Sequence, residues 1–378
     1  MRIGINFHTS DKYISGVEYY SLGLLKGLLH IDKRNDYVVY TNQPDLVREH
    51  VSSFENLTIS GIGHPKTRLA RILWEHTQLP GLAVKEKLDV LHCLSYICPI
   101  RKSSVPYVVT VHDTIAIDHP RWCKPTNALY FNLSMGAAIR KASRVISVSE
   151  CTADDLKRNF QQCCSKLRVI YPGVDGIFNA NADFSHQDEV RRRYGLPDRY
   201  VLFVGNIEPK KNIGTLLRVV AKLREQGLTH KLVLTGKRTW RSGSELDGIY
   251  KEAASGNVVL AGYVARNDLP PVYQMADVFV FLSLYEGFGF PPLEAMACGT
   301  PVVSSSRGAL KETIGNSAIV VDPLDVDEIT QAVISMATNT PLREKYVRLG
   351  LKKSRFFDWD KSAGQMLSVY EEVYRTNG

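Results

Sequence analysis

The chain has 378 residues, of which 44% are hydrophobic and 23% charged, a balance that excludes disordered and collagen-like chains. This length exceeds what one small core organises, so two or three domains are expected. The 47 Lys and Arg against 39 Asp and Glu give a net charge of +8, and residues 1–178 hold most of the excess, with 22 basic and 16 acidic residues. No block of like charge and no interleaving of basic and aromatic residues accompanies it, which disfavours nucleic acid and favours phosphate groups or an anionic membrane surface as partners.

Short β-branched segments alternate with helical patterns along the chain, which predicts parallel sheets covered by helices. The chain enters a strand at Ile3, with no apolar signal segment before it and no run near the ~20 residues that a membrane helix needs. The strands expected in the first half are 3–7, 37–40, 90–93, 107–111, 145–148 and 167–170. A turn at 171–175 and a polar stretch at 179–187 then break the pattern, so the first Rossmann-like domain is expected to span residues 1–178.

A second series of strands predicts a second Rossmann-like domain, which spans residues 179–356. Its expected strands are 200–204, 231–234, 258–260, 278–281, 302–303 and 319–321. The fold class is therefore α/β, with two facing, doubly wound parallel-sheet domains and the expected site in the cleft between them, outside the carboxyl ends of the strands. The last segment, 357–378, has apolar residues at near-helical spacing and is expected to form a helix that packs back across the N-terminal domain.

A glycine-rich turn between two carboxylates, Glu286 and Glu294, is the most informative stretch of the chain. Its two glycines let the backbone approach a ligand closely. Pro291 and Pro292, placed just before a helix, set its first turn and leave exposed amides at its positive end. Such a corner suits anions and hydroxyls, and both carboxylates can accept hydrogen bonds from a sugar. A capped turn with two solvated acids is the alternative interpretation.

This stretch resembles glycosyltransferase family 4, the retaining nucleotide-sugar transferases of GT-B fold, in which seven residues separate the two glutamates. The resemblance implies that Glu286 lies at the donor sugar and that Glu294 binds the ribose. It also implies that the amides of the turn formed by Phe288, Gly289 and Phe290 hold sugar hydroxyls. In such proteins the N-terminal domain binds the acceptor and the C-terminal domain binds the nucleotide-sugar donor.

The segment 203–212 resembles the family's strand-to-helix segment with paired basic residues, which are Lys210 and Lys211 in this chain. Two lysines at a helix start offer cations to a diphosphate and compensate the charge that develops on the leaving group during glycosyl transfer. Two solvated lysines in a turn are the alternative.

Two positions in the first half are expected near the donor. Gly16 opens a helix after the first strand, and the resemblance implies a backbone contact from it to phosphate. His112 ends an expected buried strand and resembles the histidine of family members that use GDP-mannose, which touches the donor sugar near its 6-hydroxyl. An isolated pair such as His112 and Asp113 is otherwise a satisfied polar pair more often than a catalytic dyad.

The base of the donor and a metal ion are the remaining ligands to consider. Tyr263 and Val264 follow a strand at the position where the family's nucleotide base meets backbone groups. Asp325 and Asp327 spell the DxD pattern that binds manganese in another transferase fold. Here they open an expected helix, where acids favour the positive end without a metal. No other cluster has ligand spacing, so we expect no cofactor and a metal-independent reaction.

The seven cysteines include no CxxC pair, which disfavours a disulfide framework or a zinc ribbon and favours the cytoplasm. Lys66, Arg68 and Arg71 lie among apolar residues in a basic amphipathic stretch. Such a stretch is either a solvated helix face or a surface for peripheral docking on the inner face of the cytoplasmic membrane.

These patterns and the resemblance together predict a retaining hexosyltransferase with His112, Lys211 and Glu286 as catalytic residues and no covalent nucleophile. The expected reaction moves an α-mannosyl group from GDP-mannose to a saccharide or lipid-linked oligosaccharide in surface polysaccharide or O-antigen biosynthesis. UDP-linked hexoses and GDP-rhamnose are alternative donors. A nucleotide-sugar epimerase, which needs acid and base groups for a ring proton, and a sugar-nucleotide sensor without turnover are the alternative functions.

Overall fold

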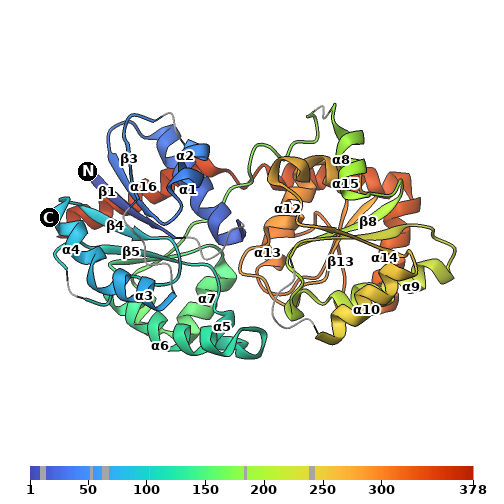
Figure 1. Cartoon of the computed structure of the whole chain (residues 1–378), viewed down its shortest axis with the longest axis horizontal. Coiled ribbons are helices and arrows are strands. Elements are labelled where there is room, and N and C mark those ends of the chain that lie inside the picture. Colours follow the sequence, from blue (N-terminus) through green and yellow to red (C-terminus); the bar gives the residue numbers. More distant parts are fainter. Residues whose placement is uncertain are drawn as a thin grey trace. The chain divides into compact units, whose positions relative to one another are not determined.

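The computed structural model describes residues 1–8, 14–51, 54–61, 68–101, 103–182, 185–237 and 243–377. The chain divides into two compact units (Figure 1). Unit 1 comprises Met1–Gly173 together with Phe357–Gly378, and unit 2 comprises Val174–Phe356. The C-terminal segment therefore belongs to the unit that the chain begins with.

Unit 1 is built on a seven-stranded sheet in the order β3-β2-β1-β4-β5-β6-β7, and every strand pair in it is parallel. The strands are β1 Arg2–Phe7, β2 Asp36–Thr41, β3 Leu57–Ser60, β4 Val90–Cys93, β5 Tyr107–Val111, β6 Arg144–Ser147 and β7 Leu167–Val169. Six of them were expected from the sequence, and β3 was not. β3 is a short, partly exposed edge strand, so it lacks the continuous apolar run that marks a buried parallel strand.

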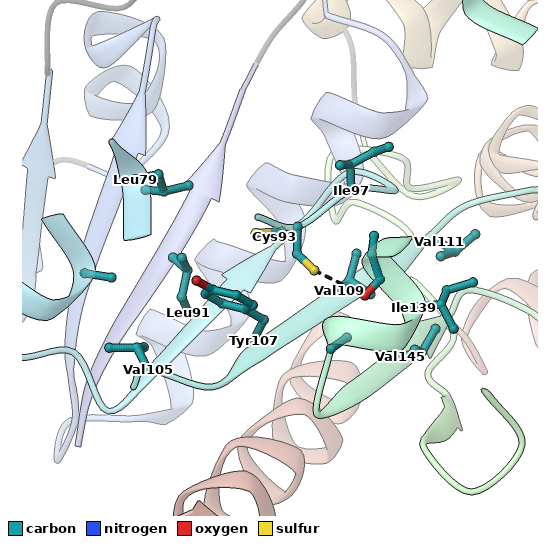
Figure 2. Packing of buried hydrophobic residues seen from close by; sticks show 14 of the residues in the cluster. Leu79, Leu91, Cys93, Ile97, Val105, Tyr107, Val109, Val111, Ile139 and Val145 are labelled. Atoms are coloured by element: carbon teal, nitrogen blue, oxygen red, sulfur yellow. Dashed lines mark hydrogen bonds between the residues drawn. The ribbon is translucent and has the colours of Figure 1, made fainter. Parts of the chain in front are cut away.

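The helices of unit 1 cover this sheet and close its core. They are α1 Gly16–Ile31, α2 Pro44–Val51, α3 Arg68–Thr77, α4 Leu79–Lys85, α5 Ile115–Asp118, α6 Pro125–Lys141, α7 Glu150–Asn159 and α16 Trp359–Asn377. Figure 2 shows Leu91, Tyr107, Val109 and Val145 from neighbouring strands with Ile139 of α6, all within one buried cluster. Both faces of β4 and β5 are buried, which is why these segments read as unbroken apolar runs in the sequence.

Unit 2 repeats the architecture on a six-stranded parallel sheet in the order β10-β9-β8-β11-β12-β13. Its strands are β8 Tyr200–Val204, β9 Lys231–Thr235, β10 Val258–Gly262, β11 Val278–Phe281, β12 Val302–Ser304 and β13 Ile319–Val320. Its helices are α8 Gln187–Tyr194, α9 Ile213–Glu225, α10 Gly243–Ala254, α11 Leu269–Gln274, α12 Phe290–Ala297, α13 Leu310–Ile314, α14 Val326–Thr338 and α15 Thr340–Ser354. All six strands expected for this half are present.

The C-terminal helix α16 is fixed to unit 1 by close packing of Trp359. A Cβ atom at Gly23 or at Gly173 would overlap Trp359, and one at Gly27 would lie 2.8 Å from the Trp359 carbonyl oxygen. The Ser362 hydroxyl donates to the carbonyl of Tyr171 at 2.5 Å. Only glycine leaves room for the backbone and the indole of Trp359 at these positions of α1 and of the segment before residue 174.

A buried polar chain links the same helix to the sheet. The imidazole of His92 in β4 bonds the Tyr370 hydroxyl of α16 at 2.6 Å and the Thr110 hydroxyl of β5 at 2.8 Å. Burial, reinforced by the neighbouring His112, lowers the pKa of His92 to about 3. His92 is therefore neutral at physiological pH and bonds two hydroxyls without carrying a buried charge.

Among the helices of the described ranges, none is both long and apolar enough to cross a bilayer.

Gly23→Ala should lower the free energy of unfolding by about 1–3 kcal/mol, because the added Cβ forces the Trp359 ring away from α1. Gly81→Ala in α4 is the matched control, since a Cβ there meets nothing within 4 Å. Alanine is the better helix former by about 1 kcal/mol, so the control should be neutral or stabilising. Urea unfolding followed by circular dichroism measures both, and equal effects would contradict the packing of α16 on α1.

Candidate functional site

The first element of the candidate site is the turn that joins β8 to α9. A 3-10 turn at Pro209–Lys211 follows the strand, and the Lys211 amide donates to the Glu208 carbonyl at 2.9 Å. Asn212 then takes a left-handed conformation with φ of 58°, which asparagine tolerates better than most residues. Its side-chain amide donates to the Pro323 carbonyl at 2.7 Å. This turn places Lys210 and Lys211 beyond the carboxyl end of β8.

The second element is the loop that follows β11, which carries Glu286. The Lys211 ammonium lies 2.5 Å from Glu286 Oε1, and the Lys210 ammonium lies 3.9 Å from Oε2. The Ser283 hydroxyl donates a short hydrogen bond to Oε1 of the same carboxylate. Only 10% of the Lys211 side chain and 11% of the Glu286 side chain are exposed, so this is a buried ion pair.

The charge state of Glu286 follows from these neighbours. Burial by itself would raise the pKa of this carboxyl, but Lys211, Lys210 and the Ser283 hydroxyl lower it below its usual value. Glu286 is therefore ionised at neutral pH. Lys211 also lies over the Phe281 ring, with its ammonium 4.8 Å from the ring centroid, which adds a cation-π contact on the buried side.

Backbone contacts hold Glu286 from the opposite side. Gly308 has a φ of 61°, and a Cβ there would lie 2.6 Å from the Glu286 carbonyl oxygen. The Ala309 amide donates to that carbonyl at 2.9 Å, and the Leu284 amide donates to the Lys210 carbonyl at 2.8 Å. The lysine turn and the glutamate loop are thus tied together by main chain as well as by charge.

The Gly-Phe-Gly-Phe turn leads from Glu286 into α12. Gly289 is the residue before the helix and has a φ of 99°, and a Cβ there would lie 2.6 Å from a Leu310 methyl. Phe288 is buried and packs edge-on against Phe290 with ring centroids 5.0 Å apart. The helix begins at Phe290, so the two prolines at 291 and 292 lie inside its first turn rather than before it. Because proline has no amide hydrogen, the helix end offers fewer amides than the sequence suggested.

Glu294, the second glutamate, has partners of its own. Arg266 Nη1 lies 2.7 Å from Glu294 Oε1, and the Tyr273 hydroxyl donates to Oε2 at 3.0 Å. Arg266 belongs to a 3-10 turn at Arg266–Asp268 after β10, and Tyr273 belongs to α11. Glu294 is buried, rather than one of two solvated acids on a capped turn.

Tyr263 and Val264 follow Gly262, the last residue of β10, at the carboxyl end of that strand. Val264 is buried, whereas 38% of Tyr263 is exposed. The Lys237 ammonium lies 5.5 Å from the centroid of the Tyr263 ring. An exposed aromatic ring next to a cation can stack on a flat ligand.

Gly16 and His112 lie in unit 1. Gly16 is the first residue of α1, whose N-terminus is capped by a bond from the Ser15 amide to the Glu18 carboxylate at 2.9 Å. His112 follows β5, and its Nε2 bonds the Leu94 carbonyl at 2.7 Å. A carbonyl only accepts, so Nε2 carries the hydrogen and Nδ1 remains an acceptor while the ring is neutral. Burial lowers the pKa of His112 although the Leu94 carbonyl and nearby acids oppose the shift.

Other sequence expectations have structural explanations. Asp113 accepts hydrogen bonds from the Tyr96 hydroxyl at 2.9 Å and the Ile115 amide at 3.1 Å. These contacts fit a structural polar residue rather than a partner of His112 in a catalytic dyad. Asp325 caps α14 by accepting from two amides of its first turn, and Asp327 pairs with Lys222. Within the ranges that the structure describes, no group of three His, Cys, Asp or Glu residues could hold a metal ion.

Three site residues were not identified from the sequence. Ser283 is three residues before Glu286, and that proximity is a signal that could have identified it. Arg266 and Tyr273 precede Glu294 by 28 and 21 residues, and no local pattern relates them to it. Their role follows only from the packing of α11 and the turn after β10 against α12.

Lys211→Met should cost about 3–5 kcal/mol of unfolding free energy, because it leaves the buried Glu286 without its closest cation. Adding Glu286→Gln should recover part of this loss, so the double variant should be more stable than the sum of the single effects by about 1–3 kcal/mol. Urea unfolding of the four proteins measures the coupling. Strictly additive effects would show that the two charges do not depend on each other.

Comparisons with known proteins assign this architecture to a family. The model described as Glycosyltransferase Family 4 matches residues 14–176, and the model described as Glycosyl transferases group 1 matches residues 186–353. The O-antigen chain mannosyltransferase B of Escherichia coli is 28% identical over 304 residues, which cover 78% of each chain. The MMP alpha-(1->4)-mannosyltransferase of Mycolicibacterium hassiacum is 29% identical over 357 residues, which cover 88% of this chain and 81% of the relative.

A solved structure shows the same fold. The Anabaena protein Alr3699/HepE, crystallised with UDP and glucose, matches with a TM-score of 0.72 and 18% identity over 98% of this chain and 100% of the other. Two parallel-sheet units that each resemble a Rossmann domain, with this likeness, show the GT-B fold. Between them, the two family models match nearly the whole chain, and it belongs to glycosyltransferase family 4.

Proposed function

We propose that the chain is a retaining transferase that moves an α-mannosyl group from GDP-mannose to a saccharide or lipid-linked oligosaccharide in O-antigen or related surface polysaccharide synthesis. The observation that carries the proposal is the buried cluster of Lys210, Lys211 and Glu286 at the carboxyl ends of β8 and β11. The mannosyl preference is supported by the names of the relatives, an O-antigen mannosyltransferase and an alpha-(1->4)-mannosyltransferase.

The lysines supply the electrostatic part of the reaction. Lys210 and Lys211 neutralise the diphosphate of the donor as the bond to the sugar breaks, and their fixed position in a buried site costs little reorganisation. Because these cations already lie at the site, we propose that transfer proceeds without a metal ion. Glu286 accepts hydrogen bonds from hydroxyls of the donor sugar. The departing diphosphate takes the proton of the acceptor hydroxyl, which attacks from the same face, so no residue serves as a covalent nucleophile.

The remaining site residues position the donor. His112 is neutral and offers Nδ1 as an acceptor to a sugar hydroxyl. The amides of Phe288, Gly289 and Phe290 hold other sugar hydroxyls. The ribose hydroxyls donate to Glu294, the base lies at Tyr263 and Val264, and Gly16 gives a backbone contact to phosphate. Catalysis then consists mainly of positioning and electrostatics.

Calorimetric titration with GDP, UDP, GDP-mannose and UDP-glucose, with and without chelator, tests the donor assignment. We expect tighter binding of the guanosine forms, unchanged by chelator. Preference for UDP forms would replace the donor with a UDP-linked hexose, and loss of binding in chelator would contradict metal independence. GDP-rhamnose is tested by the same assay, and conversion of the donor to another sugar without any acceptor would indicate an epimerase instead.

We also propose peripheral association with an anionic membrane, where a lipid-linked acceptor lies. Lys66 lies outside the described residues, and α3 begins at Arg68. The exposed face of α6 supports the proposal more strongly. This 17-residue helix has no acidic residue, ends with Arg140 and Lys141, and exposes 63% of Leu129 and 72% of Leu133. A helix that exposes apolar side chains and carries basic but no acidic residues suits an anionic interface.

Replacing both exposed leucines of α6, as in Leu129→Gln with Leu133→Gln, should reduce co-sedimentation with phosphatidylglycerol vesicles several-fold. Leu324→Gln is the matched control, since Leu324 is 61% exposed in unit 2. Binding should weaken at high salt and be absent with phosphatidylcholine vesicles. Equal binding of the α6 variant and the control would contradict docking through α6.

A further inference from the structure

Arg266 occupies a position between two acidic residues and an aromatic ring of unit 2. Its Nη1 lies 2.7 Å from Glu294 Oε1, and its Nη2 lies 3.6 Å from Asp175 Oδ2. Its guanidinium carbon lies 4.5 Å from the centroid of the Phe178 ring. Only 16% of the Arg266 side chain is exposed, so the guanidinium is held on several sides.

The contacts of Glu294 leave part of its carboxylate available. Arg266 occupies one position on Oε1, and the Tyr273 hydroxyl occupies one on Oε2. An ionised carboxylate has about four acceptor positions, so, with the partners that the described residues supply, each oxygen retains one lone pair for a further donor. With one partner on each oxygen, rotation of the carboxylate would break both bonds. The direction of the remaining lone pairs is therefore fixed before any ligand binds.

We infer that Arg266 is a positioning residue for nucleotide recognition, which aligns Glu294 so that its free lone pairs accept the two ribose hydroxyls. The inference rests on the proposed function, in which Glu294 binds the ribose. Arginine suits this task because its planar fork reaches Glu294 and Asp175 with different nitrogens, whereas lysine has a single ammonium on a flexible stem. Through Asp175 and Phe178 the same guanidinium also fixes the segment by which the chain enters unit 2.

The inference predicts a specific change in ribose discrimination rather than a general loss of binding. The probes are GDP and 2′,3′-dideoxy-GDP, and UDP and its dideoxy analogue, titrated by calorimetry. Hydrogen bonds to a charged acceptor strengthen binding, so the unaltered chain should bind the ribose form roughly 10-fold to 100-fold more tightly than the dideoxy form. In Arg266→Met the ratio of the two affinities, ribose form over dideoxy form, should fall by about tenfold. Arg266→Lys keeps the cation over Phe178 but loses the fork, so its ratio should be intermediate.

Arg307→Met is the matched control, because Arg307 is an arginine of unit 2 with a longer ion pair, 3.7 Å to Asp322, and a half-exposed side chain. It should keep the ratio of the unaltered chain. A ratio that persists in both Arg266→Met and Arg266→Lys would overturn the positioning role while leaving Glu294 assigned to the ribose. Tighter nucleotide binding by Arg266→Met would also overturn it, since Arg266 would then compete with the ribose.

Failure of the proposed function gives a different result. If the unaltered chain and Glu294→Gln both bind the ribose and dideoxy forms equally, Glu294 does not contact the ribose and both assignments fall. If Glu294→Gln alone loses discrimination, the ribose assignment stands and only the Arg266 inference fails. Thermal unfolding of each variant shows whether it is folded, and the ratio is compared only among folded proteins.

Discussion

The buried ion pair between Lys211 and Glu286 is the constraint that joins the two central elements of the candidate site, the lysine turn after β8 and the glutamate loop after β11. Removing two charges from water costs several kcal/mol per ion, and their attraction offsets this only with good geometry and further hydrogen bonds. Unit 2 supplies both, through the 3-10 turn after β8, the Ser283 hydroxyl and the main-chain bonds that join the lysine turn to the glutamate loop. A hydrophobic pair would fit such an interior at lower cost, so stability alone does not account for the charges. The proposed function accounts for them, because a diphosphate and a sugar need a cation and an acceptor at this place.

Glycines make the close approaches that this geometry needs. Gly308 admits the backbone of Glu286, and Gly289 turns the chain into α12 with a φ that other residues rarely adopt. In unit 1, Gly23 and Gly173 make room for Trp359 in the same way, so the last helix of the chain becomes part of the first unit. Across the two units, three buried titratable side chains are either neutral or lie next to charges of opposite sign. His92 and His112 are buried and neutral, whereas the ionised Glu286 is surrounded by cations.

The sequence predicted those features whose signal is local. Buried parallel strands such as Tyr200–Val204 are unbroken apolar runs, and the glycine-rich turn between Glu286 and Glu294 is distinctive by itself. β3 was missed because an exposed edge strand need not be apolar. Arg266 was missed because its contact with Glu294 depends on how α11 and the preceding turn pack on α12, which no spacing in the chain encodes. The start of α12 at Phe290, directly after the left-handed Gly289, likewise has no local signal that places Pro291 and Pro292 inside the helix.

The most direct test of the central claim compares GDP with GMP, which lacks the β-phosphate, in the unaltered chain and in Lys211→Met. If Lys211 is the cation that meets the diphosphate, the unaltered chain should bind GDP at least about tenfold more tightly than GMP, and the variant should lose most of that preference. A folded Lys211→Met protein that keeps the full preference for GDP would contradict the claim, because the buried pair would then be only a structural feature of unit 2.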